Sequence, residues 1–303
     1  MKRKHLLYVP AVAFLTACGG GEKTETTETP KDSVVAEIQY GPLKTKEEVA
    51  ATERVETLAD FSAIADKATV IRYVSSEYNK PFPTELLDAY NLQVLSLPNM
   101  TGDIPADISK FKNLTTFVVS GDFTTLPESM SELQNLKVVS LEYCKKLDMA
   151  QAFSVLSKCP NIQYLNISGC GLKELPASIG DFKQLVELRI GDNDLTALPE
   201  SVYTLSSLNE LRIGENTGLD YTAVLTSAKA LPALNELWLQ YCGFTALPAV
   251  LNEYPALETI HWSEEWKDKN SDQIVAICEK ENKKFAKLKI TWNTMSGMYY
   301  DIF

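Results

Sequence analysis

A short hydrophobic frame recurs along most of this 303-residue chain and constrains its fold more than any other feature. The frame is L-x-x-L-x-L, and successive copies start 22, 22, 26, 23, 23, 26 and 23 residues apart. A fixed period of this length is typical of stacked repeats, in which each unit contacts only its neighbours. The eight copies are Leu92/Leu95/Leu97, Leu114/Phe117/Val119, Leu136/Val139/Leu141, Ile162/Leu165/Ile167, Leu185/Leu188/Ile190, Leu208/Leu211/Ile213, Leu234/Leu237/Leu239 and Leu257/Ile260/Trp262.

A second signature follows the frame in the 22- and 23-residue units. An apolar residue precedes a proline, and further apolar residues follow at helix-like spacing, as in Leu175-Pro176 with Ile179, Phe182 and Leu185. The same pair recurs as Ile104-Pro105, Leu126-Pro127, Leu198-Pro199 and Leu247-Pro248. The segment before Leu92 carries Phe82-Pro83 and Leu86 in the same places, which predicts one further, degenerate repeat.

Together these signatures resemble the leucine-rich-repeat superfamily in its Leu-Pro form, over residues 92–262. The resemblance implies an α/β solenoid, a curved horseshoe with short parallel strands on its concave face and short helices and Leu-Pro turns on its convex face. Within each unit, the first, fourth and sixth positions should point inward while the residues between them point outward. Two longer units, 147–160 and 219–232, lack the Leu-Pro turn, and we expect a true helix in each.

Both ends of such a stack need caps, because the terminal units would otherwise expose their core. We expect residues 45–91 to form an N-terminal cap and the degenerate repeat, beginning with the capping box Thr45-x-x-Glu48. Residues 263–303 should form the C-terminal cap. Its helix is predicted near 274–285, and the alternation of Leu288, Ile290 and Trp292 predicts a strand.

The N-terminus predicts export and a lipid anchor. Three basic residues precede an apolar run, 6–15, that is too short to span a bilayer, so residues 1–17 read as a secretory signal. The run ends in Leu15-Thr16-Ala17-Cys18-Gly19, which resembles the lipobox of bacterial lipoproteins and makes Cys18 the expected lipid attachment site. Residues 18–44 are rich in Gly, Thr and Glu and should form a flexible tether. Gly19 after the cysteine favours the outer membrane.

Charge and composition narrow the possible partners. Removing residues 1–17 removes three basic residues and no acidic ones, so the net charge of −11 becomes −14. Such a chain should not bind nucleic acid through its phosphates, and contact with a membrane should come through the lipid anchor only.

The cysteines follow the repeat and form no recognisable disulfide framework. Cys144, Cys170 and Cys242 each fall three residues after the sixth position of the frame, where Asn193 and Asn216 stand in other units. In the family this position holds a ladder of Asn or Cys that turns inward to the backbone of adjacent coils, so these cysteines are expected to be buried thiols. A Cys144–Cys170 bridge remains an alternative, because adjacent coils place Cα atoms about 5 Å apart. Cys159 and Cys278 are expected in the core.

The sequence contains no recognisable signature of a catalytic or metal-binding site. After removal of the signal the chain has one histidine, His261, without an accompanying nucleophile motif. The cysteines lie one to a coil and not in C-x-x-C pairs, so no metal site and no cofactor are predicted. We therefore expect a protein that is not an enzyme, although carboxylates are plentiful enough that a carboxylate-based hydrolase stays a third choice.

Binding is better supported, because the frame predicts which residues face the inner curve. The N-terminal part of that face is small and neutral, whereas the C-terminal part gathers charged and aromatic residues of the kinds enriched in binding hot spots. Asp192 and Glu215, just after their strands, extend this patch. Glu187/Arg189 and Glu210/Arg212 could equally be cross-strand ion pairs with little binding role, but an outward Trp238 has no evident structural reason. The expected partner-binding residues are Tyr143, Tyr164, Asn166, Glu187, Arg189, Glu210, Arg212, Glu236, Trp238, Gln240, Tyr241 and His261.

The favoured function is therefore a lipid-anchored envelope protein that recognises a protein or peptide partner on its concave face. Binding of a glycan or peptidoglycan is the alternative, because Trp238, Tyr241, Asn166 and Gln240 suit stacking against sugars and hydrogen bonding to them.

Overall fold

The computed structural model describes residues 80–263, 271–285 and 287–291, together with the short segments 6–7, 36–37, 48 and 70–72. The chain divides into two units, Met1–Pro42 and Leu43–Phe303. In the first unit, β1 (Leu6–Leu7) pairs antiparallel with β2 (Ala36–Glu37). The lipid site Cys18 and the remainder of the expected signal and tether lie outside the described residues, as do Thr45 and the chain end after residue 291.

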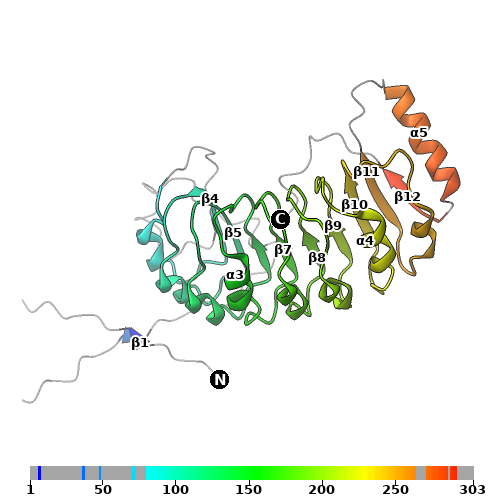
Figure 1. Ribbon diagram of the computed structural model, residues 1–303. Helices are drawn as coiled ribbons and strands as arrows, with labels where there is room; N and C mark the ends of the chain where they lie inside the picture. The colour runs from blue at the N-terminus through cyan, green and yellow to red at the C-terminus, as the bar shows by residue number, and fades with distance from the viewer. Residues whose placement is uncertain are drawn as a thin grey trace, which may run out of the picture. The chain divides into compact units, whose positions relative to one another are not determined.

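The second unit holds a ten-stranded parallel sheet whose strands lie side by side in chain order, from β3 to β12 (Figure 1). Each strand is short, because each belongs to one repeat. The strands are β3 (Val70–Arg72), β4 (Val94–Met100), β5 (Thr116–Gly121), β6 (Val138–Ser140), β7 (Tyr164–Asn166), β8 (Glu187–Arg189), β9 (Glu210–Arg212), β10 (Glu236–Gln240), β11 (Thr259–Ser263) and β12 (Lys289–Thr291).

The register of the sheet follows the sequence frame. Every strand from β4 to β11 begins at the third position of its unit, and equivalent positions pair across neighbouring strands. Leu188, for example, lies opposite Leu165 on one side and Leu211 on the other. The fourth-position side chains of β4 to β11 are all fully buried. The alternation predicted from the sequence is therefore confirmed, and β3 pairs with β4 from Val70↔Val94 in the same way.

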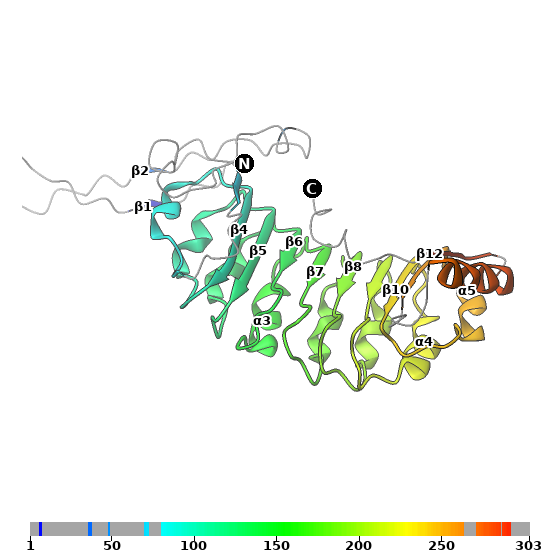
Figure 2. The same ribbon diagram turned by 90° about the horizontal axis from the view of Figure 1, so that it is seen from above.

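On the opposite side of the stack, each Leu-Pro turn starts a short 3-10 helix (Figure 2). In all six cases the residue before the helix is proline, whose fixed φ suits a helix start and whose missing N–H costs no hydrogen bond there. The apolar residue three places after the proline then points into the core. These helices are η1 (Thr84–Asp88), η2 (Ala106–Lys110), η3 (Glu128–Glu132), η4 (Ala177–Asp181), η5 (Glu200–Thr204) and η6 (Ala249–Glu253).

The two longer units contain the expected α-helices, α3 (Met149–Leu156) and α4 (Tyr221–Ala228). Each is capped by an aspartate. The carboxylate of Asp148 accepts a hydrogen bond from the backbone N–H of Gln151 at 3.0 Å, and that of Asp220 from Ala223 at 3.0 Å. Such a cap satisfies one of the free N–H groups at a helix start. None of the helices within the described segments is both long and apolar enough to cross a membrane.

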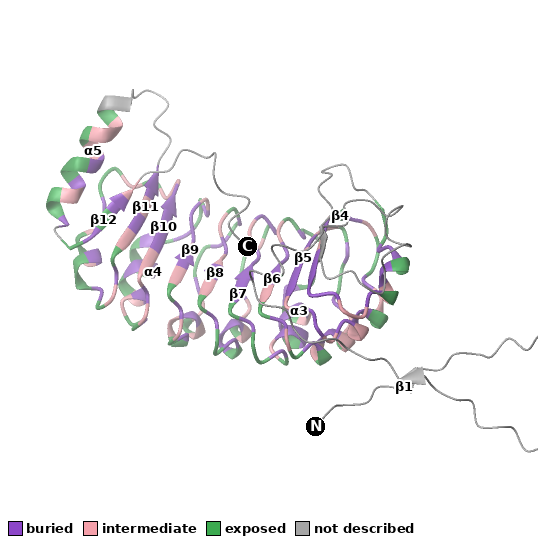
Figure 3. Ribbon diagram, turned by 180° about the vertical axis from the view of Figure 1, so that it is seen from behind, coloured by how far each residue is buried: buried purple, intermediate pink, exposed green. Residues whose placement is uncertain are grey.

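A continuous hydrophobic core runs between the sheet and the opposite side, and buried residues follow the strands in Figure 3. The ladder of inward-turned polar residues is also present. The side-chain amide of Asn193 donates to the carbonyl of Ile167 in the preceding coil at 3.1 Å, and that of Asn216 to Ile190 at 3.0 Å. These bonds satisfy backbone acceptors that would otherwise be buried without a partner.

The predicted cysteine ladder is confirmed at Cys144 and Cys170 but not at Cys242. The Cys144 thiol donates to the Val119 carbonyl at 3.7 Å and the Cys170 thiol to the Leu141 carbonyl at 3.1 Å, each in the preceding coil. All five described cysteines are free, so the Cys144–Cys170 bridge is not present in this structure. Cys159 and Cys278 are buried, as expected. Cys242 is only half-buried and bonds within its own turn, at Gln240, so the expectation of burial was wrong there.

The C-terminal cap contains the expected helix and strand. The helix α5 (Ser271–Lys284) is followed by β12, which pairs with β11. The buried carboxylate of Glu281 accepts from the backbone N–H of Leu247 at 3.2 Å, while the ammonium of Lys284 donates to the Leu247 carbonyl at 2.8 Å. These two charged side chains fasten α5 to the last complete unit.

Candidate functional site

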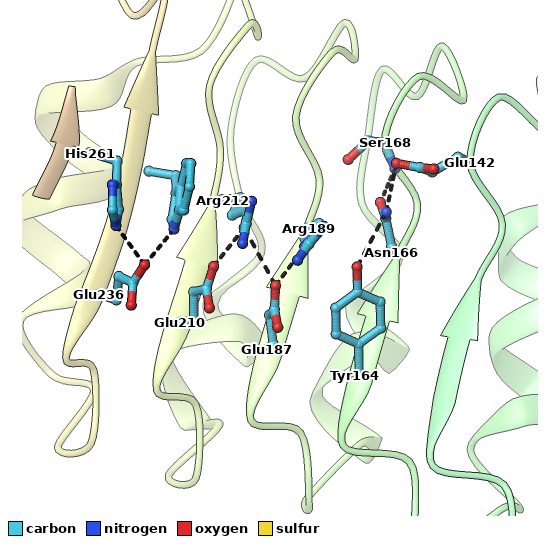
Figure 4. Close-up of polar contacts among 11 residues, drawn as sticks. Glu142, Tyr164, Asn166, Ser168, Glu187, Arg189, Glu210, Arg212, Glu236 and His261 are labelled. Carbon is cyan, nitrogen blue, oxygen red and sulfur yellow. Dashed lines mark hydrogen bonds and ion pairs between the residues drawn. The ribbon is translucent and has the colours of Figure 1, made fainter. Parts of the chain in front are cut away.

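The third and fifth positions of the strands form one surface of the sheet, which we call the strand face. From β7 to β11 this surface carries a row of charged, polar and aromatic side chains, some of which contact each other across the strands (Figure 4). The row therefore contains most of the residues predicted from the sequence for partner binding.

Two glutamate–arginine pairs occupy the centre of the row, on β8 and β9. Arg189 Nε lies 2.5 Å from Glu187 Oε1, and Arg212 Nε lies 2.6 Å from Glu210 Oε1. Both pairs thus run along one strand, from the third to the fifth position, and not across strands as predicted. A longer contact does cross between the strands and joins Arg212 Nε to Glu187 Oε1 at 3.4 Å. All four side chains are less than one-fifth exposed, so the guanidinium groups are held in fixed orientations.

Trp238 lies between two neighbours and is only 9 % exposed. On one side the guanidinium carbon of Arg212 lies 3.8 Å from the indole centroid, and on the other the His261 ring stacks at 3.8 Å with a 20° interplanar angle. The indole N–H donates to Glu236 Oε1 at 2.9 Å. The prediction of an unsupported, exposed aromatic residue was therefore wrong, because side chains on adjacent strands cover both faces of the ring.

His261 joins the last two strands to the row. Its Nε2 lies 2.6 Å from Glu236 Oε1, and its Nδ1 lies 2.7 Å from the hydroxyl of Thr291 on β12. Burial lowers the pKa of His261 below its usual value, although Glu236 opposes this. The order Thr291–His261–Glu236 has the connectivity of a hydrolase triad. However, the imidazole is packed flat against Trp238, and the contact links β12 to β10 and β11. We interpret the trio as an anchor for the last strand.

At the other end of the row, Tyr164 and Asn166 are buried, with exposed fractions of 8 % and 1 %. The Asn166 amide donates to Glu142 Oε1 at 2.7 Å, and its carbonyl oxygen accepts from the backbone N–H of Ser168 at 3.1 Å. The guanidinium carbon of Arg189 lies 4.9 Å from the Tyr164 ring centroid. Asn166 therefore supports Glu142 and the end of β7 and offers no free amide to a partner, contrary to its predicted role.

Several carboxylates lie close together in the row, and the pKa of one of them is strongly raised. The pKa of Glu210 is raised to about 7 in all: burial raises it most, Arg212 lowers it, and the like charges of Glu187 and Glu236 on the two adjacent strands add to the rise. Near neutral pH this carboxyl group is therefore only partly ionised.

Just after the strands, the chain passes through the left-handed region in one unit after another. Among the residues that the structure describes, five other than glycine have positive φ, and each stands two places after the sixth position of its frame. Glycine or asparagine fits this conformation with least strain, yet most of these positions carry large or charged side chains. They are Asn99 (53°), Tyr143 (57°), Asp192 (52°), Glu215 (61°) and Tyr241 (51°).

Three of these residues, Tyr143, Asp192 and Glu215, line a cleft of about 190 Å³ at the carboxyl ends of β6 to β10. The cleft brings together five of the predicted binding residues, namely Tyr143, Arg189, Arg212, Trp238 and Gln240. It is also lined by Glu142, Ser168, Gly191, Asp192, Gly214 and Glu215. The remaining predicted residues are Tyr164, Asn166, Glu187, Glu210, Glu236, Tyr241 and His261, which lie outside this lining.

Glu142 and Ser168 were not identified from the sequence, although their positions were available. Each comes directly after the sixth position of its frame, as Gln240 does, and this place marks the rim of the cleft. Glycine occupies the same place in the two units between Ser168 and Gln240. A Cβ atom at Gly214 would collide with the backbone of Gln240, so the residue must be small for adjacent coils to pack.

No cluster of three or more histidine, cysteine, aspartate or glutamate residues within the described segments could hold a metal ion.

A family model identifies the class of protein. The model described as a leucine-rich repeat region matches residues 128–299, which is more than half of the chain. The chain therefore belongs to the leucine-rich-repeat superfamily, as its frame and its α/β solenoid indicate. No curated protein matches the sequence.

Solved structures are similar in fold. One is the glycosylated Toll–Spatzle complex of Drosophila, with 17 % identity, a TM-score of 0.52, and coverage of 68 % of this chain and 30 % of that one. A plant peptide hormone receptor in complex with RGF2 has 22 % identity and a TM-score of 0.43, covering 65 % and 36 %. A leucine-rich-repeat protein of Leptospira interrogans has 19 % identity and a TM-score of 0.31, covering 70 % and 82 %. The chain spans about a third of the length of the matched chains in the first two of these structures.

Proposed function

We propose that this protein binds a protein or peptide partner through the strand face of its C-terminal units, with the cleft after β6 to β10 as the centre of the contact. The observation that carries this proposal is the cleft itself, which is bordered by Tyr143, a large side chain that is 45 % exposed. Tyrosine is enriched in binding hot spots because it buries a large area at low entropic cost. Leucine-rich-repeat proteins mostly act as interaction scaffolds, and Toll in complex with Spatzle is one such solved structure.

The size of the cleft favours a macromolecular partner over a small-molecule substrate. Pockets for drug-sized ligands usually measure about 300–1,000 Å³, whereas this cleft measures about 190 Å³. A cavity of about 150 Å³ accommodates a benzene-sized group. The cleft therefore has room for one side chain, and the rest of a partner would lie along the strand face.

The surroundings of Trp238 argue against the glycan alternative. Stacking on a sugar needs one free face of an aromatic ring, but Arg212 covers one face of this indole and His261 the other. Asn166, the other expected sugar contact, is buried.

The proposal includes attachment to a membrane. The lipobox-like segment ending at Cys18 supports an exported protein held by acyl chains, most simply in the outer membrane. The Gly- and Thr-rich residues that follow would let the repeats reach a partner away from the lipid surface.

Site-specific photocrosslinking in intact cells tests the proposed face. A photoreactive phenylalanine derivative at Tyr143 should yield one discrete crosslinked product. The same derivative at Lys183, an exposed residue that follows η4 on the opposite side, should not. Products of equal yield from both positions, or a product from Lys183 alone, would show that the partner does not dock on the strand face.

A further inference from the structure

The cleft carries an excess of negative charge. Five carboxyl groups line it or pair with its arginines, against two guanidinium groups, and one of the five, Glu210, is partly protonated near neutral pH. Arg189 and Arg212 are each already paired at Nε with a glutamate of their own strand. The negative charges of the carboxylates therefore outnumber the positive charges of the arginines. The carboxylates are Glu142, Glu187, Asp192, Glu210 and Glu215.

Two of these carboxylates have no cation beside them. Within the part of the chain that the structure describes, neither Asp192 nor Glu215 forms an ion pair or a side-chain hydrogen bond. The two occupy equivalent positions in consecutive units. Burial raises the pKa of Glu215, and the nearby charge of Asp192 raises it further. The repulsion between these two like charges would be relieved by a positive charge brought into the cleft.

A second, independent feature is the side chain of Gln240. This residue is only 8 % exposed and lines the cleft, yet its amide makes no hydrogen bond with any described residue. The amide atoms of Gln240 are not among the fully buried polar atoms that lack a partner, so they are the part of this buried residue that is open to the cleft. An amide that lines a cleft without a partner can bond to a group entering from outside, and its carbonyl oxygen accepts from an N–H donor.

We propose that this cleft is a recognition pocket for one basic side chain, arginine or lysine, of the partner. The carboxylates of Asp192 and Glu215 pair with the cation, the Gln240 carbonyl accepts one of its N–H groups, and the exposed ring of Tyr143 covers the aliphatic stem. The volume of about 190 Å³ suits one such side chain. This inference rests on the proposed function and specifies the chemistry of the ligand.

The experiment uses the purified full chain and small probes, so that it needs no identified partner. N-acetyl-arginine amide and N-acetyl-lysine amide are titrated by ligand-observed NMR, with N-acetyl-citrulline amide as the neutral analogue of matching shape and N-acetyl-glutamate amide as the anionic one. We expect a dissociation constant in the millimolar range for the basic probes and at least about tenfold weaker binding of the citrulline and glutamate probes.

Isosteric variants locate the binding. Asp192→Asn, Glu215→Gln and Gln240→Leu should each weaken binding of the arginine probe by at least about fivefold. Glu200→Gln, which removes an exposed carboxylate from η5 on the opposite side, should leave it unchanged. Far-ultraviolet circular dichroism confirms that each variant is folded.

Three results would overturn the proposal. These are equal binding of the citrulline and arginine probes, preferential binding of the glutamate probe, and no binding of any probe. Photocrosslinking from Tyr143 distinguishes this failure from failure of the proposed function. If a partner is crosslinked from Tyr143 but none of the amino-acid probes binds, only the proposed pocket for a basic side chain is contradicted. Bound arginine without a crosslink from Tyr143 would reject the docking face.

Discussion

At the scale of single residues, the strand face is held together by side chains that were expected to be free for a partner. Trp238 is the clearest case, because it bridges β9 and β11 through Arg212 and His261 and also bonds to Glu236. Outward-facing residues on this sheet therefore contribute to stability, in addition to the recognition proposed for them. A loss of binding after mutation of such a residue must be compared with its effect on folding.

Trp238→Ala should lower the free energy of unfolding by about 3 kcal/mol, because it removes a buried aromatic ring and leaves Glu236 and His261 with fewer contacts. Leu237→Ala, which truncates the adjacent inward side chain, should cost about 2–5 kcal/mol. Urea denaturation measures both. Trp238→Phe is the control, because it retains a stacked ring and loses only one hydrogen bond, worth about 1–2 kcal/mol. Unchanged stability of Trp238→Ala would mean that the stack does not form in solution.

The titration of Glu210 should make stability depend on pH. The ordinary pKa of a glutamate side chain is 4.5, whereas that of Glu210 is about 7 in the folded protein, so the folded state holds the proton more tightly than the unfolded chain. The resulting stabilisation is fully present below about pH 4.5 and is lost as the pH rises through about 7. Glu210→Gln should flatten this decline by about 1–3 kcal/mol, measured by urea denaturation from pH 5 to pH 8. Parallel pH profiles of the wild type and Glu210→Gln would contradict the shift.

At the scale of elements, the repeats differ mainly in the segment that comes after each strand. Turns with a Leu-Pro pair lead into 3-10 helices, whereas the two long units use aspartate caps and full α-helices. Within the ladder, Asn193 and Asn216 each reach into the preceding coil with a short hydrogen bond from the side-chain amide. A cysteine thiol is a weaker donor, so units with cysteine depend more on packing.

The cap of α3 should have a measurable effect. Asp148→Ala removes the side-chain acceptor for the Gln151 N–H and should lower the free energy of unfolding by about 1 kcal/mol. Asp181→Ala, which replaces an exposed aspartate at the end of η4, should change it by less than about 0.5 kcal/mol. Equal effects in thermal denaturation would contradict a specific role of the cap.

Alkylation should rank the ladder thiols. In the folded protein Cys242 should react with iodoacetamide before Cys144 and Cys170, because it is half-buried while the other two are buried and burial raises the pKa of Cys170 to about 11. In urea without reductant all three should be modified, as detected by mass spectrometry. If Cys144 and Cys170 required a reductant first, they would be joined by a disulfide bond.

At the scale of the whole molecule, stability is shared between neighbouring coils, and the last coil depends on its cap. The contacts of Glu281 and Lys284 with Leu247, and that of His261 with Thr291, link this cap to the repeats that form the strand face. A partner bound near β10 would therefore lie on a part of the stack that is fixed from both sides.

The proposed lipid anchor makes a prediction for the full chain in cells. Cys18→Ser should move the protein from the detergent phase to the aqueous phase in phase partitioning and abolish incorporation of a fatty-acid analogue, because acylation needs the thiol. Cys242→Ser, which alters a half-buried cysteine of the repeats, should leave both unchanged. Membrane partitioning that persists after Cys18→Ser would contradict lipid attachment at this residue.

The repeat in the sequence was sufficient to predict the fold, the start of every strand from β4 to β11 and the two α-helices. It also predicted the inward ladder residues, except that Cys242 is only half-buried. These features depend on a local period, since three inward residues per unit are enough to set the register of a strand. The same frame correctly separated inward Leu237 from outward Trp238. The residues just after the strands were predicted to extend the charged patch, and Tyr143 and Gln240 do line the cleft with the two arginines, whereas Tyr241 does not.

The contacts of the outward side chains, in contrast, can be seen only in the folded structure. Adjacent strands are about 4.8 Å apart, so long side chains on consecutive units necessarily touch, but the sequence does not reveal which neighbour each one will contact. The contacts in this structure bury Asn166 and Trp238 and pair Glu210 with Arg212 along a strand. Among the described residues, they leave Asp192 and Glu215 outside any ion pair. The cleft is formed by side chains from five neighbouring coils, so the sequence of any single repeat is not sufficient to predict it.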